Sequence, residues 1–154
     1  MMTNLSCKVI QALNGRTLVT AESCTGGGVG AVLTAVAGSS SVFKGGIISY
    51  TNEVKCKLLK VDPLLLAREG AVSAPVAEAM AIGARNALDA DVAVSVTGLA
   101  GPGGDEYGNP VGTVYIGFSN AYKTVSKAFL FEGDRQEVRQ QAIDAALQLI
   151  LECI

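Results

Sequence analysis

Short apolar runs alternate with helical patterns along this chain, and this alternation restricts the possible folds more than any other feature. The runs read as strands because they are rich in β-branched residues and bounded by turn residues; they lie at 16–22, 45–50, 91–98, 113–119 and 124–132. Apolar residues at helical spacing predict helices at 3–14, 29–37, 51–60, 62–69, 73–90 and from 134 onward. Continuously apolar strands are typical of a sheet covered on both faces.

The order of these elements predicts the architecture. Strands that alternate with helices form parallel sheets with helices on both faces. The last two strands are separated only by residues 120–123, which predicts a hairpin and therefore an antiparallel neighbour. The expected fold is α/β, a three-layer α/β/α sandwich with a mostly parallel, mixed sheet. At 154 residues we expect a single domain, over residues 1–154.

The charge content limits the classes of partner. Charged residues make up 17% of the chain, below the usual quarter, so we expect part of the surface to be covered by a second copy in a homo-oligomer. The net charge is −2 and the 12 Lys and Arg residues are scattered, which argues against a nucleic-acid partner. No run of 18 apolar residues occurs, so we expect no membrane-spanning segment.

The cysteine and histidine content limits metal and redox chemistry. Histidine is absent and the cysteines at 7, 24, 56 and 153 have no CxxC spacing, so we expect no metal site. Scattered cysteines in a chain of this size are typical of reduced thiols in a cytoplasmic protein. The first residues lack the basic and apolar regions of a signal peptide, which favours the same location.

The ends of the predicted strands indicate where a ligand binds. In open α/β sheets, ligands bind beyond the carboxyl ends of the strands. In this chain those ends fall at 23–27, 50–55, 97–104 and 132–135, and these stretches are rich in hydroxyls, glycine and charge. We therefore expect one site assembled from several loops.

The stretch "AGSSSVFKGGIISYTNEVK", residues 37–55, contains a candidate nucleophile and a candidate base. A serine becomes nucleophilic only when a neighbouring base accepts its proton, and this chain has no histidine to do so. Lys55 can replace it, since burial lowers the pKa of a lysine, and Tyr50 can act as a relay. Ser40, in the loop before the strand, completes this predicted catalytic group. The alternative is that the serines form a turn and the lysine is solvated.

The stretch "SCTGGG" lies between a predicted strand and a predicted helix. Its residues Thr25, Gly26 and Gly27 can present backbone amides to an anion at the helix N-terminus, so we predict that they bind substrate together with Ser23. A tight turn with close helix packing is the alternative, because the stretch is neither GxGxxG nor a Walker A loop. Cys24 is a further candidate nucleophile at the same helix start.

Two other segments contain candidate binding residues. Thr97 and Gly98 begin a glycine-rich segment that continues to residue 112 and is too long for a simple connector. Asp105 and Glu106 in this loop do not have the spacing of an EF-hand. Arg135 lies in the first turn of the last helix, where a cation opposes the helix dipole, so either a ligand or solvent is its partner.

The segments at 20–61, 70–84, 94–118 and 131–142 together resemble a known family. They contain "TAESCTGGG", "VTGLAGPGGD" and "FEGDRQEVRQQA", and the resemblance covers residues 5 to 150 in the same motif order. The family is the C-terminal domain of the competence/damage-inducible CinA proteins, which also occurs as a stand-alone bacterial enzyme. The resemblance implies the stand-alone form, a nicotinamide-nucleotide amidohydrolase that converts nicotinamide mononucleotide to nicotinate mononucleotide and ammonia.

Carried over residue by residue, the resemblance implies a nucleophile at Ser40, with Tyr50 and Lys55 as its partners. Ser41 is a less favoured candidate for the attack. The resemblance implies further site residues at Ser23, Thr97 and Arg135, and it implies no metal or organic cofactor. Two other classes stay open: a non-catalytic nucleotide-binding or regulatory module linked to competence or DNA damage, and a purely structural oligomer subunit.

Overall fold

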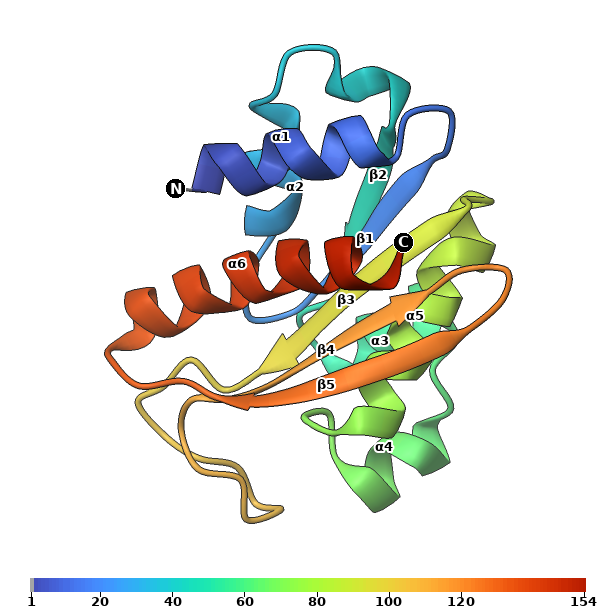
Figure 1. Ribbon diagram of the computed structural model, residues 1–154. Helices are drawn as coiled ribbons and strands as arrows, with labels where there is room; N and C mark the ends of the chain where they lie inside the picture. Colours follow the sequence, from blue (N-terminus) through green and yellow to red (C-terminus); the bar gives the residue numbers. More distant parts are fainter. Residues whose placement is uncertain (1) are drawn as a thin grey trace.

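A five-stranded sheet forms the centre of the molecule (Figure 1). The computed structural model describes residues 2–154, with side chains described from Asn4 onward. The strands are β1 (Leu18–Glu22), β2 (Phe43–Ile48), β3 (Val92–Gly98), β4 (Thr113–Ser119) and β5 (Thr124–Leu130). Their order across the sheet is β2-β1-β3-β4-β5.

The strand directions confirm the predicted mixed sheet. β1 is parallel to both β2 and β3, whereas β4 is antiparallel to β3 and to β5. The predicted hairpin is therefore β4–β5. Because β1, β2 and β3 run in the same direction, their carboxyl ends meet at one edge of the sheet.

Helices cover both faces of this sheet, which confirms the three-layer sandwich (Figure 1). One face is covered by α1 (Met2–Ala12), α2 (Gly28–Thr34) and α6 (Arg135–Cys153). The other face is covered by α3 (Asn52–Leu59), α4 (Pro63–Glu69) and α5 (Ala74–Leu88). A short 3-10 helix, η1 (Ser39–Ser41), precedes β2.

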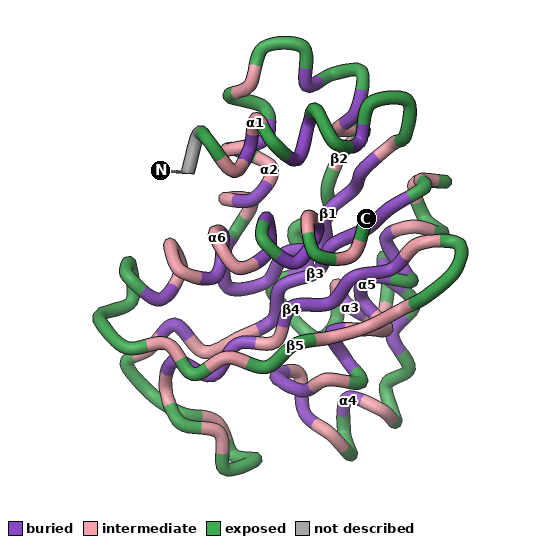
Figure 2. The backbone as a smooth tube through the Cα atoms, in the orientation of Figure 1, coloured by how far each residue is buried: buried purple, intermediate pink, exposed green. Residues whose placement is uncertain are grey.

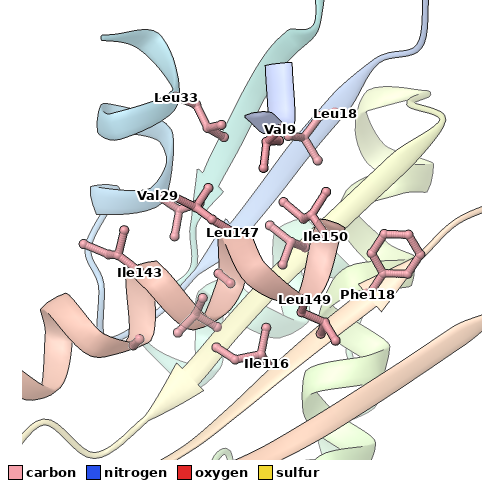
Figure 3. Close-up of a cluster of buried hydrophobic side chains, with 14 of the residues drawn as sticks. Val9, Leu18, Val29, Leu33, Ile116, Phe118, Ile143, Leu147, Leu149 and Ile150 are labelled. Carbon is pink, nitrogen blue, oxygen red and sulfur yellow. The ribbon is translucent and has the colours of Figure 1, made fainter. Parts of the chain in front are cut away.

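The apolar core lies on both sides of the central strands. In β3, the side chains of Val94 and Val96 pack with α1, α2 and α6. The side chain of Ala93 points to the other face and packs with α4 and α5. Figure 3 shows the first of these clusters, where Val9 of α1, and Leu147 and Ile150 of α6, gather over the sheet. This two-sided burial explains the continuously apolar sequence of β3.

Strand β2 does not fit the prediction that it is buried on both faces. Its residues alternate between half-buried and exposed, and Ile48 is 57% exposed (Figure 2). The physical reason is its place at the edge of the sheet, where helices cover only part of its outer face. Tyr50, predicted to end this strand, lies two residues beyond it.

Helix ends follow the local sequence signals. The Asp134 carboxylate accepts a hydrogen bond from the backbone N–H of Glu137, and the Glu137 carboxylate accepts one from the N–H of Asp134, so a capping box starts α6. The Thr51 hydroxyl caps α3 by accepting from the N–H of Val54. Ser73 is the N-cap residue of α5 by position, but its hydroxyl donates to the Gly70 carbonyl instead.

Gly83 sets the distance between α5 and α3, and this gives a testable prediction. A methyl group at this position would overlap the carbonyl oxygen of Leu59 and lie 2.8 Å from its carbonyl carbon. Because backbone atoms cannot rotate away, we expect Gly83→Ala to lower the free energy of unfolding by about 1–3 kcal/mol in urea denaturation. Gly45→Ala is the control, since its nearest neighbour, a methyl of Leu88, is 3.9 Å away. Equal stability of both variants and the wild type would contradict this close packing.

Candidate functional site

A pocket of about 310 Å³ lies where the loops after β1, β2 and β3 meet. Its polar lining residues come from four separate segments of the chain: Ser23, Tyr50, Asn52, Lys55, Thr97 and Arg135. Small and apolar residues, including Ala71, Val72, Leu99 and Ala100, form the remaining wall. None of the described residues that line the pocket carries a carboxylate, so the pocket is suited to an uncharged or anionic ligand.

Lys55 is the most unusual residue of the pocket because its side chain is almost completely buried, with 1% exposed. It projects from the second turn of α3. Its Nζ lies 2.8 Å from the carbonyl oxygen of Ser49, 3.3 Å from that of Tyr50 and 3.1 Å from Oγ of Ser23. Among residues 2–154, no carboxylate forms an ion pair with it.

Burial favours the neutral form of Lys55, and its Nζ faces the hydroxyl of Ser23. Burial lowers the pKa of Lys55 from its ordinary value of 10.5 to about 8. A neutral amine has two N–H donors and one lone pair. As an ammonium, Nζ donates to the Ser23 hydroxyl and to the carbonyls of Ser49 and Tyr50. Carbonyl oxygens only accept, so when Nζ loses a proton the two carbonyls keep its N–H groups and the lone pair faces the Ser23 hydroxyl. The arrangement is that of a general base beside a potential nucleophile.

Ser23 directly follows β1, and the sheet holds its backbone in place. Its N–H donates to the carbonyl of Val96 on β3 at 2.9 Å, which extends the pairing of β1 with β3 by one residue. The side chain is 7% exposed, yet it lines the pocket. A rigid backbone on one side and Lys55 on the other leave the hydroxyl little freedom.

Cys24 also lines the pocket, but its surroundings do not activate it. The side chain is 6% exposed, and burial raises the pKa of its thiol to about 11. The thiol therefore stays protonated near neutral pH and is a poor nucleophile. The prediction that Cys24 attacks a substrate is not supported by this environment.

Tyr50 and Arg135 form the rim of the pocket. The Arg135 guanidinium donates to the carbonyl of Gly101 at 2.6 Å and to the hydroxyl of Tyr50 at 3.3 Å. The Tyr50 side chain is 59% exposed. Arg135 has a pocket partner rather than only solvent, and it brings a positive charge to the entrance.

The loop between β3 and β4 forms the wall opposite α3. Thr97 lies at the end of β3, and its hydroxyl donates to the carbonyl of Ala71 at 2.8 Å. Farther along the loop, the Asn109 side-chain amide donates to the carbonyl of Val72 at 3.1 Å, and the Tyr107 hydroxyl donates to the carbonyl of Ala67 at 2.9 Å. These contacts fasten the loop to α4 and to the segment between α4 and α5.

Comparison with known proteins identifies the family. The family model "CinA C-terminal domain" matches residues 2–154. The chain belongs to the CinA C-terminal domain family. This CinA domain is 48% identical over 149 residues to the nicotinamide-nucleotide amidohydrolase PncC of Escherichia coli, a match that covers 95% of the chain and 90% of that relative. It is 52% identical over 126 residues to a CinA-like protein of Geobacter, covering 82% of the chain but only 30% of the longer relative.

Solved structures confirm the fold of this CinA domain. A competence-damaged protein (CinA) superfamily protein from Escherichia coli superposes with a TM-score of 0.98 at 35% identity, over 100% of this chain and 91% of that one. The competence/damage inducible protein from Agrobacterium tumefaciens superposes with a TM-score of 0.94 at 35% identity, over 98% and 94% of the two chains. The α/β sandwich is therefore shared across the family.

Six of the residues predicted from the sequence of this CinA domain line the pocket. They come from all four of the strand-end stretches, and they are Ser23, Tyr50, Lys55, Thr97, Gly98 and Arg135. The rule that ligands bind beyond the carboxyl ends of parallel strands therefore located the pocket. Cys24, the further candidate nucleophile, also lines the pocket, whereas Thr25, Gly26, Gly27, Ser40 and Ser41 do not.

Ser40, the predicted nucleophile, lies at the opposite end of the sheet from Lys55, so the structure does not bring these two residues together. Leu18 at the start of β1 pairs with Phe43 at the start of β2, so η1 with Ser40 lies at the amino ends of the parallel strands. The six residues of β2, about 20 Å of strand, separate this end from the pocket. The hydroxyl of Ser41 donates to the carbonyl of Gly38, as in the alternative turn interpretation. The serine beside Lys55 is Ser23.

The structure places Thr25, Gly26 and Gly27 beside a carboxylate of the protein itself. The buried carboxylate of Glu22 accepts hydrogen bonds from the Thr25 hydroxyl at 2.6 Å and from the backbone N–H groups of Val29 and Gly30 at 2.8 and 3.0 Å. The protein thus supplies its own anion to the start of α2. None of the three predicted residues lines the pocket.

Sequence reasoning missed three residues at or behind the pocket of this CinA domain. Asn52 lines the pocket from the first turn of α3, and its place just after a strand end was the available signal. Glu22 was missed because its burial depends on the fold. Arg139 lies four residues after Arg135 on α6, a spacing that places both on one face of the helix.

The described residues restrict other kinds of site. Across residues 2–154, no three His, Cys, Asp or Glu side chains cluster so as to hold a metal ion. None of the described helices combines the length and apolarity that crossing a membrane requires. All four cysteines are free thiols.

Proposed function

We propose that this CinA domain hydrolyses the carboxamide of nicotinamide mononucleotide to nicotinate mononucleotide and ammonia. Two findings support the proposal. A relative that spans nearly the same length carries the name nicotinamide-nucleotide amidohydrolase. The pocket contains a buried lysine in hydrogen-bond contact with a serine, and this contact is the observation that carries the chemistry.

In the proposed reaction, Ser23 is the nucleophile and Lys55 is the base. Lys55 Nζ takes the proton of the Ser23 hydroxyl as Oγ attacks the carboxamide carbon, which gives a tetrahedral intermediate. The C–N bond then breaks, and Lys55 gives its proton to the nitrogen, which leaves as ammonia. The direct contact of 3.1 Å means that no relay between these two residues is needed.

In the second half of the reaction, water replaces Ser23 as the nucleophile and Ser23 becomes the leaving group. Water attacks the ester carbon of the acyl-enzyme, and Lys55 takes one proton of the water. The bond between the ester carbon and Oγ breaks, and Ser23 recovers its proton from Lys55. The carboxylic acid that forms releases its remaining proton to solvent and leaves as the carboxylate of nicotinate mononucleotide, and no reactant other than water is consumed.

The remaining pocket residues fit the rest of this substrate. The apolar wall of Val72, Leu99 and Ala100 can contact the flat nicotinamide ring. Arg135 at the rim suits the phosphate, since a guanidinium binds phosphate oxygens through several N–H donors. We assign the exposed ring and hydroxyl of Tyr50 to substrate contact at the entrance.

The partners expected for this function are a small-molecule nucleotide and a second copy of the chain. A nucleic-acid partner stays disfavoured by the net charge of −2. Four free thiols suit a reducing compartment such as the cytoplasm.

The test of the function is ammonia release from nicotinamide mononucleotide by the purified protein, with product identified by mass. We expect stoichiometric nicotinate mononucleotide and ammonia, without added cofactor. Nicotinamide riboside, which lacks the phosphate, is the matched control and should be a poorer substrate. A folded protein that binds the nucleotide but releases no ammonia would instead indicate a non-catalytic binding module.

A further inference from the structure

A charged side chain outside the pocket holds the turn that carries Ser23. Arg139 Nε donates to the carbonyl of Cys24 at 2.9 Å, and its Nη2 donates to the carbonyl of Thr25 at 3.2 Å. These are the first two carbonyl groups after Ser23 in the chain. Arg139 does not line the pocket, so it contacts the turn from behind.

Helix α6 also contacts the end of the same turn. Ile143, one helical turn after Arg139, packs against the start of α2, and Figure 3 shows it close to Val29. A methyl group at Gly28 would lie 2.6 Å from Cδ1 of Ile143, so the two helices are in close contact there. The position of α6 therefore determines where the turn lies.

Arg139 forms no ion pair among the described residues of the chain. Its guanidinium donates to two neutral carbonyls on successive residues. The planar guanidinium presents its N–H donors in a fixed geometry, so two bonds to one turn restrain both the position and the orientation of that turn. A lysine offers a single flexible ammonium and cannot reproduce this restraint.

We propose that Arg139 is a positioning residue for the reaction. It holds the turn after Ser23 so that Oγ stays within hydrogen-bond distance of Lys55 Nζ. This inference rests on the proposed function, because it requires Ser23 to be the nucleophile. A displacement of about 1 Å at a reacting atom costs on the order of a hundredfold in rate, so a residue that fixes the turn acts on kcat.

The test compares Arg139→Gln and Arg139→Lys with the wild type. We expect Arg139→Gln to lower kcat about tenfold to a hundredfold and to leave KM within about twofold, since Arg139 does not contact the pocket. Arg139→Lys should recover only part of the loss. Arg16→Gln is the matched control, because it also removes an arginine–carbonyl hydrogen bond, to Ala12, far from the pocket. Its kcat should stay within about twofold of the wild type.

A second readout does not depend on the substrate. An alkyl fluorophosphonate reacts with an activated serine by forming an O–P bond with loss of fluoride, and intact mass measures the rate. We expect labelling at Ser23 to slow in Arg139→Gln by the same factor as kcat. If the wild type is labelled at Ser23 but does not hydrolyse the nucleotide, the proposed function fails while the labelling rates still decide the role of Arg139.

Other outcomes overturn the inference. An unchanged kcat and labelling rate in Arg139→Gln would mean that the turn keeps its position without Arg139. A raised KM with unchanged kcat would make Arg139 a binding residue instead. If circular dichroism indicates that Arg139→Gln is unfolded, Arg139→Lys decides by the same two measurements.

Discussion

Replacing Ser23 by alanine should remove amide hydrolysis almost completely, lowering kcat by about a thousandfold or more. The reason is that the substitution removes the oxygen 3.1 Å from Lys55 Nζ, and no other described hydroxyl group has a hydrogen bond to that nitrogen. Without it, Lys55 can at best activate a water molecule. The measurement is ammonia release under saturating nicotinamide mononucleotide.

Ser40→Ala and Ser41→Ala are the controls for this prediction. Both residues lie in η1 at the amino ends of the parallel strands, so each variant should keep kcat within about twofold. Strong activity in Ser23→Ala together with loss in Ser40→Ala would restore the nucleophile predicted from the sequence. Loss in neither variant would point away from serine chemistry.

The location of the pocket was predictable from the sequence because it follows from strand direction. Alternating strands and helices imply parallel strands, and the carboxyl ends of parallel strands meet at one edge. Ser23, Lys55 and Thr97 each lie in one of the four stretches that the sequence placed at the carboxyl ends of strands. The start of α6 was predictable for a local reason, because Asp134 and Glu137 are three residues apart and each accepts a hydrogen bond from the backbone N–H of the other.

The pairing of serine with lysine was not predictable from distance along the chain. Ser40 is 15 residues from Lys55 and Ser23 is 32 residues away, yet the sheet register brings Ser23 to the lysine. Strand β2 lies between Ser40 and Lys55 in the chain, so these two residues lie at opposite ends of that strand. Glu22 illustrates a second limit, because only the folded structure places its carboxylate against the N–H groups of α2.

Replacing Lys55 by methionine should lower kcat by a similar factor, about a hundredfold to a thousandfold or more. Methionine has a similar length but no basic nitrogen, so the proton of Ser23 has no acceptor. Lys55→Arg should be equally inactive, because a guanidinium stays protonated at every pH that the protein tolerates. Activity in Lys55→Arg near the wild-type level would mean that only positive charge is needed there.

The pH dependence provides an independent check of the base. With a pKa of about 8, only about a tenth of Lys55 is neutral at pH 7. We expect kcat/KM to rise about tenfold per pH unit below pH 8 and to level off above it. A flat profile between pH 6 and 9 would contradict a lysine base.

Because it is buried, Lys55 should lower the free energy of unfolding near neutral pH. A residue kept only for the stability of the fold would not have this effect. The pKa of Lys55 is about 8 in the folded protein and 10.5 ordinarily, so between these values the unfolded chain holds the proton that the folded protein has lost. The free energy of unfolding therefore rises with pH between about 8 and about 10.5. At pH 8 and below, the buried lysine lowers it by about 3 kcal/mol relative to its value above pH 10.5.

Lys55→Met removes this dependence but also removes two hydrogen bonds to carbonyls, each worth about 1 kcal/mol. The third bond, to Ser23, can be replaced by water because Ser23 lines the pocket. At pH 7 we therefore expect the inactive variant to be about 1 kcal/mol more stable than the wild type in urea denaturation. At pH 10 the order should reverse, since the wild-type lysine is then largely neutral in the folded state. The comparison isolates Lys55 because all other titrating groups are common to both proteins. A variant less stable than the wild type at both pH values would mean that Lys55 stabilises the fold and that its burial carries no electrostatic cost.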